Sequence, residues 1–159
     1  SGWWLEFRRV LFRSVFDPFP VGRLDKDTEG LLLITNDGEL NHRLTSPKWH
    51  VDKTYYAEID KMVDEKDVEK FKKGITLDDG YKCLPAKLEI LSSDENGSEV
   101  NITIQEGKFH QVKRMFEARG KNVVYLKRLT MGNISLDEEL DEGTYRELTE
   151  EEIEILKSI

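Results

Sequence analysis

An acidic cluster near the start of the chain is the first candidate for chemistry. Residues 25–30 read DKDTEG, so three carboxylates alternate with other side chains and are followed by a glycine. The spacing imitates the first half of a calcium loop, but Asn36 stands where such a loop needs a bidentate acid, and the prolines and glycine at 18–22 exclude an entering helix. The cluster is therefore either a local turn, with carboxylates bound to nearby amides, or the source of a catalytic carboxylate.

Other chemistries have little support. The sequence has no G-x-S-x-G segment, and His42, His50 and His110 stand at no spacing typical of a metal site or a catalytic triad. Cys83 is the single cysteine, so it cannot form an internal disulfide, and no Cys/His cluster could hold zinc. We therefore expect no metal site and a reducing compartment, most simply the cytoplasm.

Charge is unevenly distributed along the chain. The formal net charge is −8, which by itself disfavours a nucleic-acid partner because phosphate binding requires cations. The excess of acids lies at 135–159, whereas 105–131 is basic. This basic stretch is either a solvated helix face or a surface for phosphate. Its basic residues are Lys108, Lys113, Arg114, Arg119, Lys121, Lys127 and Arg128.

The length and composition favour one globular domain. The chain has 159 residues, 38% of them hydrophobic and 35% charged, which is enough for a proper core. No apolar run approaches the roughly 20 residues needed to cross a bilayer, so we expect no membrane span. The composition of the sequence changes abruptly at Val15. We expect residues 1–14 to be a non-native or leftover segment and residues 15–159 to form the domain.

Periodicity predicts many strands and a few short helices. Alternating or β-branched segments predict strands at 31–35, 53–59, 86–91, 100–104, 123–126 and 133–136, of which 86–91 and 100–104 form an antiparallel pair. Apolar spacing and end signals predict helices at 38–45, from Asp64 to a stop at Gly74, at 109–119, and after a capping box of Thr149 and Glu152.

The helix predicted at 109–119 is amphipathic. Phe109, Val112, Met115 and Phe116 share one face, which should pack on the core. No regular βαβ alternation and no internal repeat is present. The pattern predicts the α+β class, with a mixed, largely antiparallel β-sheet and short flanking helices.

Three stretches taken together resemble the motifs of pseudouridine synthases. They are VGRLDKDTEGLLLITNDG at 21–38, KTYYAEI at 53–59 and EGKFHQVKRMF at 106–116. The segment LNHRLTSPKWHVDKTY looks most like the RsuA-type branch, which modifies a uridine of small-subunit (16S) ribosomal RNA. The resemblance covers residues 15–159 and implies the catalytic fold of that family. It also implies an RNA uridine isomerase that uses no cofactor, because this isomerisation needs no redox or energy input.

The resemblance assigns three catalytic residues. Asp25, in the GRLD motif, would be the essential carboxylate, and Tyr55 would be the active-site tyrosine, whose ring can stack on the uracil. Lys113 matches a family position at which a Lys or Arg pairs with the aspartate, and a nearby cation keeps a buried carboxylate ionised. We therefore predict an ion pair between Asp25 and Lys113. Tyr56, on the opposite face of the strand, is predicted to be a core residue.

Further residues are candidates for RNA contact, because the target nucleotide must flip out of its stack to react. Arg23 is placed to fill the vacated space or to hold phosphate, or alternatively to pair with Asp27 or Glu29. The remaining candidate RNA surface consists of Lys53, His110, Gln111, Arg114, Lys127 and Arg128.

Two family features do not precede Val15: a small basic RNA-binding domain of the S4 type and a strand carrying L-N-K-P-x-G. We therefore expect an N-terminally truncated catalytic domain. Its partner would be ribosomal RNA, 16S by resemblance, either free or within a small-subunit assembly intermediate. Two alternatives stay open, a synthase for large-subunit ribosomal RNA and a non-catalytic RNA-binding or ribosome-assembly factor that keeps the fold.

Overall fold

A six-stranded sheet forms the centre of the protein in a computed structural model that describes residues 17–159. The strand order is β2–β7–β4–β6–β5, with β8 paired to β7. β2 runs parallel to β7 and every other pair is antiparallel, which confirms the predicted fold class. The strands are β2 (Glu29–Gly30), β4 (Lys53–Ile59), β5 (Lys87–Asp94), β6 (Gly97–Ile104), β7 (Val123–Met131) and β8 (Ile134–Ser135). The prediction for residues 1–14 lies outside the described residues.

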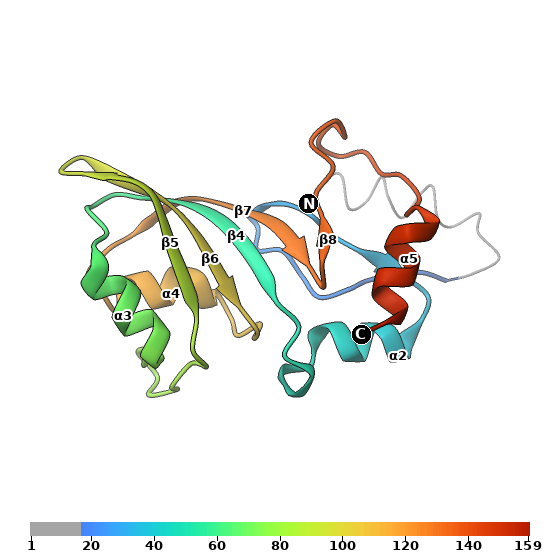
Figure 1. Cartoon of the computed structure of the whole chain (residues 1–159), viewed down its shortest axis with the longest axis horizontal. Coiled ribbons are helices and arrows are strands. Elements are labelled where there is room, and N and C mark those ends of the chain that lie inside the picture. Colours follow the sequence, from blue (N-terminus) through green and yellow to red (C-terminus); the bar gives the residue numbers. More distant parts are fainter. Residues whose placement is uncertain (1–16) are drawn as a thin grey trace.

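Helices gather at two ends of this sheet (Figure 1). At one end α3 (Glu65–Lys73) and α4 (Gln111–Glu117) cover one face of β4, β5 and β6. At the other end α2 (Gly38–Thr45) and α5 (Glu150–Lys157) lie beside a two-stranded antiparallel sheet of β1 (Phe19–Pro20) and β3 (Ile34–Thr35). A short 3-10 helix, η1 (Pro47–Trp49), connects α2 to β4. No helix in the described part of the chain is long and apolar enough to cross a membrane.

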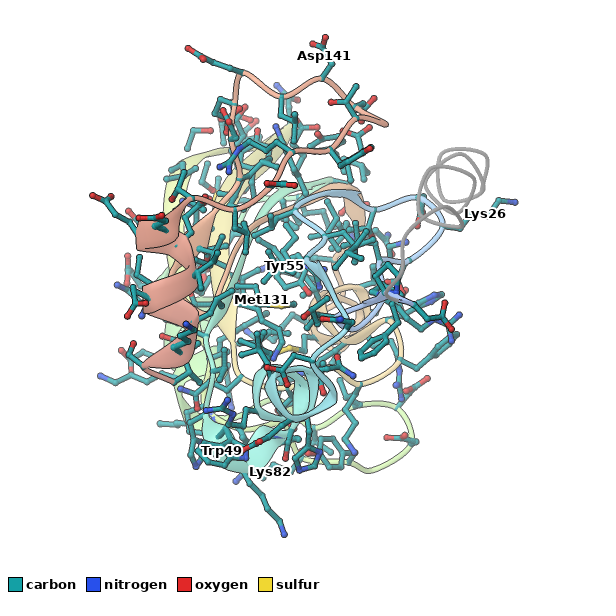
Figure 2. All side chains as sticks on the ribbon, turned by 90° about the vertical axis from the view of Figure 1, so that its right-hand side faces the viewer. Lys26, Trp49, Tyr55, Lys82, Met131 and Asp141 are labelled. Atoms are coloured by element: carbon teal, nitrogen blue, oxygen red, sulfur yellow. The ribbon has the colours of Figure 1, made fainter. Side chains whose placement is uncertain are left out.

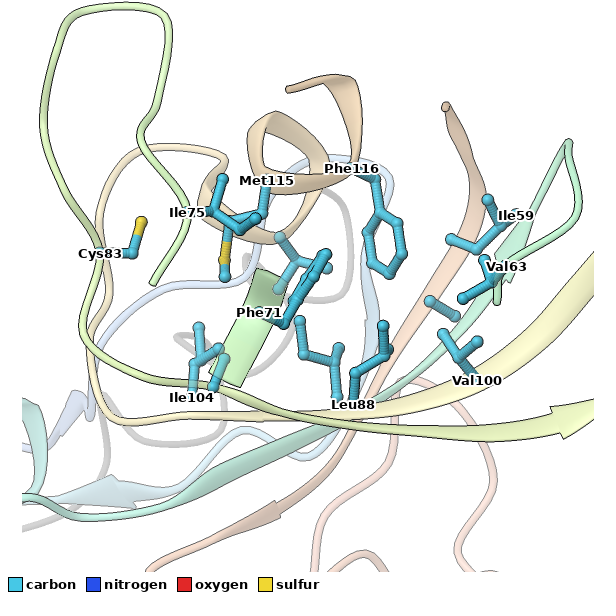
Figure 3. Packing of buried hydrophobic residues seen from close by; sticks show 14 of the residues in the cluster. Ile59, Val63, Phe71, Ile75, Cys83, Leu88, Val100, Ile104, Met115 and Phe116 are labelled. Carbon is cyan, nitrogen blue, oxygen red and sulfur yellow. The ribbon is translucent and has the colours of Figure 1, made fainter. Parts of the chain in front are cut away.

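Each end has its own hydrophobic core. The larger core lies between α3, α4 and the sheet, and the rings of Phe71 and Phe116 meet there at a centroid distance of 4.9 Å (Figure 3). The smaller core joins Leu44 of α2 and Leu156 of α5 to Met131 of β7. The larger core fixes the position of α4, which carries candidate site residues at its start.

Local end signals in the sequence placed α3 and α5 correctly. The Asp64 side chain accepts from the backbone of Asp67 in a capping box, and α3 ends at Gly74, where φ is +99°. The second predicted capping box, of Thr149 and Glu152, begins α5. The predicted strand pair at 86–91 and 100–104 is confirmed. It is longer than expected, because the pairing of β5 with β6 continues as far as Asp94 and Gly97.

The prediction of a strand at 31–35 is wrong over most of its length, because the first residue of this segment bonds to one sheet and the following residues bond to the other. Leu31 N–H still donates to Arg128 O in the large sheet, at 2.9 Å, whereas Leu33 O already accepts from Val21 N–H in the small sheet, at 2.8 Å. Gly30, the last residue of β2, passes close to the backbone of β7 just before this change of sheet. Its φ is +108°, and a Cβ there would lie 2.2 Å from Arg128 O, so no larger residue fits.

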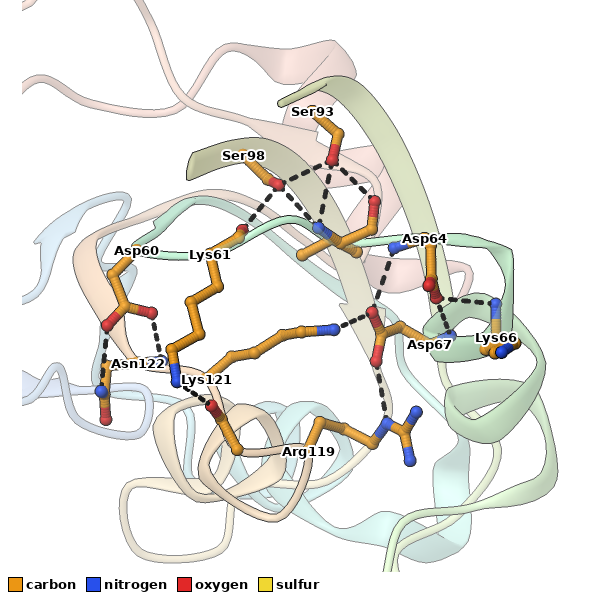
Figure 4. Close-up of polar contacts among 12 residues, drawn as sticks. Asp60, Lys61, Asp64, Lys66, Asp67, Ser93, Ser98, Arg119, Lys121 and Asn122 are labelled. Atoms are coloured by element: carbon orange, nitrogen blue, oxygen red, sulfur yellow. Dashed lines mark hydrogen bonds and ion pairs between the residues drawn. The ribbon is translucent and has the colours of Figure 1, made fainter. Parts of the chain in front are cut away.

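A buried carboxylate ties α3 to the segment between α4 and β7 (Figure 4). Asp67 is fully buried and accepts from Arg119 Nε at 2.8 Å and from the Lys121 ammonium. Its other local partner is the backbone N–H of Asp64, at 3.1 Å. Burial alone would raise the pKa of Asp67, but the hydrogen bonds from Lys121 and Arg119 outweigh that effect, and the pKa lies below its ordinary value.

Candidate active site

The Asp25 carboxylate is presented by a loop that both sheets hold in place. Upstream, Val21 bonds to Leu33 in the small sheet, and downstream Glu29 and Gly30 pair with β7. Between these anchors Thr28 N–H donates to Asp25 O at 2.9 Å and closes a turn. The loop keeps the Asp25 side chain 31% exposed, open to a ligand but sheltered on one side.

The loop meets the start of α4 through two pairs of opposite charge. His110 Nε2 lies 3.7 Å from Asp25 Oδ1, and Lys113 Nζ lies 2.5 Å from Asp27 Oδ1. The predicted ion pair between Asp25 and Lys113 is therefore wrong in this structure, because the second carboxylate of the loop takes the lysine. The hydrogen bond from Lys113 lowers the pKa of Asp27 below its usual value. Lys26, between the two aspartates, extends away from the body of the molecule (Figure 2).

Tyr55 lies on the face of β4 that looks toward the larger core. Its ring is half-buried against that core, and Arg128 is its cross-strand neighbour on β7. Among the described residues the Tyr55 side chain makes no hydrogen bond. Tyr56 does point to the opposite face, but the prediction that it belongs to the core is wrong. It is half-buried there, donating to Glu58 Oε1 at 3.2 Å, with its ring edge-on to Tyr125.

Three members of the predicted RNA surface are buried instead. Lys53 is 4%, Arg128 is 2% and Gln111 is 4% exposed. The Arg128 Nε donates to Leu31 O at 2.8 Å, while its Nη2 is buried without a partner among the described residues. The side chain of Gln111 turns inward to Glu106. These polar groups line the interior next to Tyr55 and α4, so they do not belong to an exposed surface.

The other basic candidates differ in how closely acidic side chains bind them. Arg114 is bound to Asp78 at 2.7 Å and to Asp79 at 3.1 Å, and Lys127 has only a 3.7 Å contact with Glu138. Arg23 is exposed and has no side-chain partner among residues 17–159.

The alternative pairing of Arg23 is therefore wrong. Asp27 binds Lys113, and Glu29 accepts from the Tyr125 hydroxyl at 2.7 Å. Both carboxylates considered for Arg23 are thus occupied by other residues, and Arg23 keeps its charge available next to Asp25.

A buried glutamate that the sequence analysis missed fixes the start of α4. Glu106 is 1% exposed and accepts from the Tyr81 hydroxyl, from Leu84 N–H at 2.7 Å and from Gln111 Nε2 at 3.2 Å. Gln111 Oε1 in turn accepts from Lys108 N–H at 3.1 Å. This network determines where the loop 107–110 lies. The burial of Glu106 could not be predicted, because its donors Tyr81 and Leu84 are far from it in the sequence.

The helix predicted at 109–119 begins later than expected, at Gln111. His110 adopts the left-handed conformation, with φ 46° and ψ 38°, so the helical backbone cannot continue through it. Val112, Met115 and Phe116 are buried as predicted, but Phe109 is 74% exposed. The prediction that Phe109 packs on the core is therefore wrong, because the turn at His110 directs it outward.

The stability of the protein should depend on pH through Lys53. Burial, together with the nearby Arg128 guanidinium, lowers the pKa of Lys53 to about 8. In the unfolded chain the lysine binds its proton up to about pH 10.4, so between these values the unfolded state binds more protons and stability rises with pH. Relative to Lys53→Met, the free energy of unfolding of the wild type should increase by on the order of 2 kcal/mol from pH 7 to 10.

Urea unfolding at several pH values would check this expectation. Lys48→Met is the matched control, because Lys48 is exposed and its removal should leave the pH dependence of the wild type in place. A Lys53→Met curve that runs parallel to the wild-type curve over this range would contradict the expectation.

In residues 17–159 no group of three or more His, Cys, Asp or Glu side chains could hold a metal ion. What the site offers instead is a half-exposed carboxylate, a histidine beside it, and two cations, Lys113 and Arg23, on the same loop and helix. Such a site can bind an anionic substrate and act on it with a carboxylate as nucleophile or base.

Comparison with known proteins gives consistent results. The sequence profile of the family described as RNA pseudouridylate synthase matches residues 4–118. A protein of Bacillus subtilis (strain 168) named as an uncharacterized RNA pseudouridine synthase is 55% identical over 141 residues, covering 89% of this chain and 59% of that protein. The ribosomal small subunit pseudouridine synthase A of Haemophilus influenzae (strain ATCC 51907 / DSM 11121 / KW20 / Rd) is 52% identical over 136 residues, covering 85% of this chain and 57% of that protein.

A solved structure has the same fold. The crystal structure of a pseudouridylate synthase superposes with a TM-score of 0.82 at 48% identity, covering 87% of this chain and 59% of that chain. The chain thus spans a little over half the length of the curated relatives it matches. Asp25, Tyr55 and Lys113 all lie within the matched region 4–118.

Proposed function

This chain belongs to the RNA pseudouridylate synthase family, and we propose that the protein isomerises a specific uridine of small-subunit (16S) ribosomal RNA to pseudouridine. The observation that carries the proposal is the Asp25 carboxylate, held open to a ligand by a loop fixed at both ends and placed 3.7 Å from His110. The choice of small-subunit RNA is supported by the name of the relative from Haemophilus influenzae. A ribosomal RNA substrate in turn supports a cytoplasmic location.

The reaction dictates what the site must do. It breaks the bond between uracil N1 and ribose C1′, turns the base while retaining it and joins C5 to C1′. C5 loses its proton to solvent and N1 takes one up, so the product is an isomer of the substrate. Asp25 would act at the sugar, either by attacking C1′ or by removing a sugar proton, and in both roles it must be ionised. Tyr55 would stack on the turning base with its hydroxyl near C5.

Lys113 would support the charge of Asp25 once RNA is bound. Asp27, its present partner, is 71% exposed, and an exposed ion pair contributes only about 0–1 kcal/mol. The lysine can therefore exchange Asp27 for Asp25 at little cost when substrate excludes water from the loop. Arg23, exposed and without a partner in the described chain, would contact a phosphate or fill the space left by the flipped nucleotide.

The other basic candidates would act differently from one another. Lys127 would contact phosphate from the rim of the site. Lys53, Gln111 and Arg128 are buried, so their contribution would be to position Tyr55 and the start of α4. Arg114 is bound to Asp78 and Asp79, and its contribution would likewise be to hold the loop before α4.

Release of tritium from RNA labelled with [5-³H]uridine tests the proposal directly, because isomerisation sends the C5 hydrogen to solvent. We expect release from a small-subunit ribosomal RNA transcript or from a small-subunit assembly intermediate, without any added cofactor. Release from large-subunit RNA alone would overturn the choice of substrate and keep the reaction. Binding of these RNAs with no release from any of them would favour the non-catalytic RNA-binding factor.

A further inference from the structure

We propose that Phe109, stacked on His110 beside Asp25, is a platform on which an unpaired base of the RNA substrate stacks. The inference rests on the proposed function and adds a base-binding residue to it. A flipped uridine leaves the neighbouring bases of its strand without a stacking partner, and an exposed aromatic ring stacked on the histidine beside the reacting carboxylate can replace that partner.

The Phe109 ring forms one end of an aromatic stack that leads to the carboxylate. It lies on the His110 imidazole at a centroid distance of 3.9 Å and an interplanar angle of 16°. His110 Nε2 lies 3.7 Å from Asp25 Oδ1. Because Phe109 is 74% exposed, the ring remains open on the side away from His110. A base stacked there would extend this stack by one ring.

The backbone under this ring is fixed before any ligand arrives. Phe109 O accepts from Arg114 Nη1 at 3.0 Å, and the same guanidinium is held by Asp78 and Asp79. His110 occupies the left-handed region, with φ 46°, which is uncommon for a residue other than glycine. A platform fixed in this way loses little conformational entropy on binding.

The charges around Phe109 favour a nucleic acid over an apolar protein partner. Single exposed apolar residues are common on protein surfaces, so exposure alone decides nothing. Here, however, Phe109 directly follows Lys108 in the chain and comes four residues before Lys113. Lys108 Nζ lies 4.5 Å from the centroid of the Tyr81 ring, and Lys113 Nζ lies 2.5 Å from Asp27 Oδ1. Aromatic rings interleaved with cations are typical of sites for single-stranded nucleic acid, where bases stack and phosphates follow the charges.

Three substitutions separate stacking from other contributions of this side chain. Phe109→Ala should bind a small-subunit ribosomal RNA transcript about 5- to 150-fold more weakly, which is the range for loss of one stacked base. Phe109→Trp, which keeps an aromatic face, should bind as well as the wild type, and Phe109→Leu, which is apolar without one, should resemble Phe109→Ala. The slope of log affinity against log salt should stay unchanged, because no phosphate contact is lost.

Val124→Ala is the matched control, since Val124 is another exposed apolar residue, 66% exposed, on β7. It should bind RNA as the wild type does, and all variants should unfold within about 2 °C of the wild type. The proposal of a stacking platform would be wrong if Phe109→Leu bound RNA as tightly as the wild type. It would also be wrong if Phe109→Ala bound RNA without loss of affinity.

Tritium release distinguishes failure of the platform from failure of the proposed function. If the wild type isomerises RNA and Phe109→Ala binds equally well, the platform is wrong and the function stands. If affinity depends on Phe109 in the expected order but the wild type releases no tritium, the platform stands and the function is wrong. If the wild type neither binds nor isomerises RNA, both are overturned.

Discussion

Replacing Asp25 with asparagine should lower the rate of isomerisation by roughly ten-thousand-fold or more while leaving RNA affinity unchanged. Asparagine keeps the shape of the side chain, but it can neither attack C1′ nor accept a proton from the sugar. Loss of an essential catalytic group of this kind lowers the rate by roughly ten-thousand-fold. Affinity should not fall, because removing a negative charge from a site that receives phosphates does not weaken it. Single-turnover tritium release at saturating RNA and equilibrium RNA binding would be measured together.

Asp27→Asn is the matched control for this prediction. It changes a carboxylate of the same loop, 71% exposed and bound to Lys113, without changing the group assigned to the sugar. We expect its rate within about tenfold of the wild type. Equal losses in the two variants would mean that the charge of the loop matters and that Asp25 has no special role. Weaker RNA binding by Asp25→Asn, with no activity in the wild type, would favour a binding factor.

Replacing Asp67 with asparagine should lower the free energy of unfolding by about 3–5 kcal/mol at neutral pH. Asp67 is fully buried, and its loss would leave Arg119 and Lys121, which are 27% and 14% exposed, without their counter-charge. The pKa of Asp67 is lowered in the folded protein, so this stabilisation is present above the ordinary pKa of an aspartate and disappears as the pH falls through the folded value. The difference between wild type and variant should therefore shrink in acid.

Urea unfolding at neutral and acidic pH would measure this difference. Glu69→Gln, an exposed position on the same helix, is the control and should change stability by less than about 0.5 kcal/mol. Equal stability of the Asp67→Asn variant and the wild type at pH 7 would contradict the account of how α3 is attached to α4 and β7.

The parts of the fold that could be predicted are those specified by neighbouring residues. The alternation at 53–59 gave β4, and the capping boxes at Asp64 and Thr149 gave the starts of α3 and α5. These signals act through bonds within one turn or one strand, so they are visible in the sequence. The α+β class followed from the order of such elements.

The parts that could not be predicted depend on residues far apart in the chain. The strand predicted at 31–35 is interrupted because Leu31 bonds to Arg128 in one sheet and Leu33 bonds to Val21 in the other. Glu106 is buried because Tyr81 and Leu84 supply donors to it. Burial of charged residues such as Lys53 is rare, so it was not expected. Each case was decided by a tertiary partner that no local pattern reveals.

The candidate site also combines features that neighbouring residues specify with features that depend on residues far apart in the chain. Motif resemblance selected Asp25 and the start of α4 correctly as neighbours, but it paired Lys113 with the wrong carboxylate of the loop. Two aspartates separated by a single residue can both reach the same helix, so spacing could not choose between them. The outward turn of Phe109 depends on one backbone conformation, that of His110, which the apolar spacing of 109–116 does not encode.

Chemical mapping of pseudouridine in small-subunit ribosomal RNA, incubated with the wild type and with Asp25→Asn in parallel, would show whether the protein makes pseudouridine through Asp25. We expect a new pseudouridine at a single position with the wild type and none with the variant. The same mark made by both proteins, or no mark made by the wild type on RNA that it binds, would contradict it.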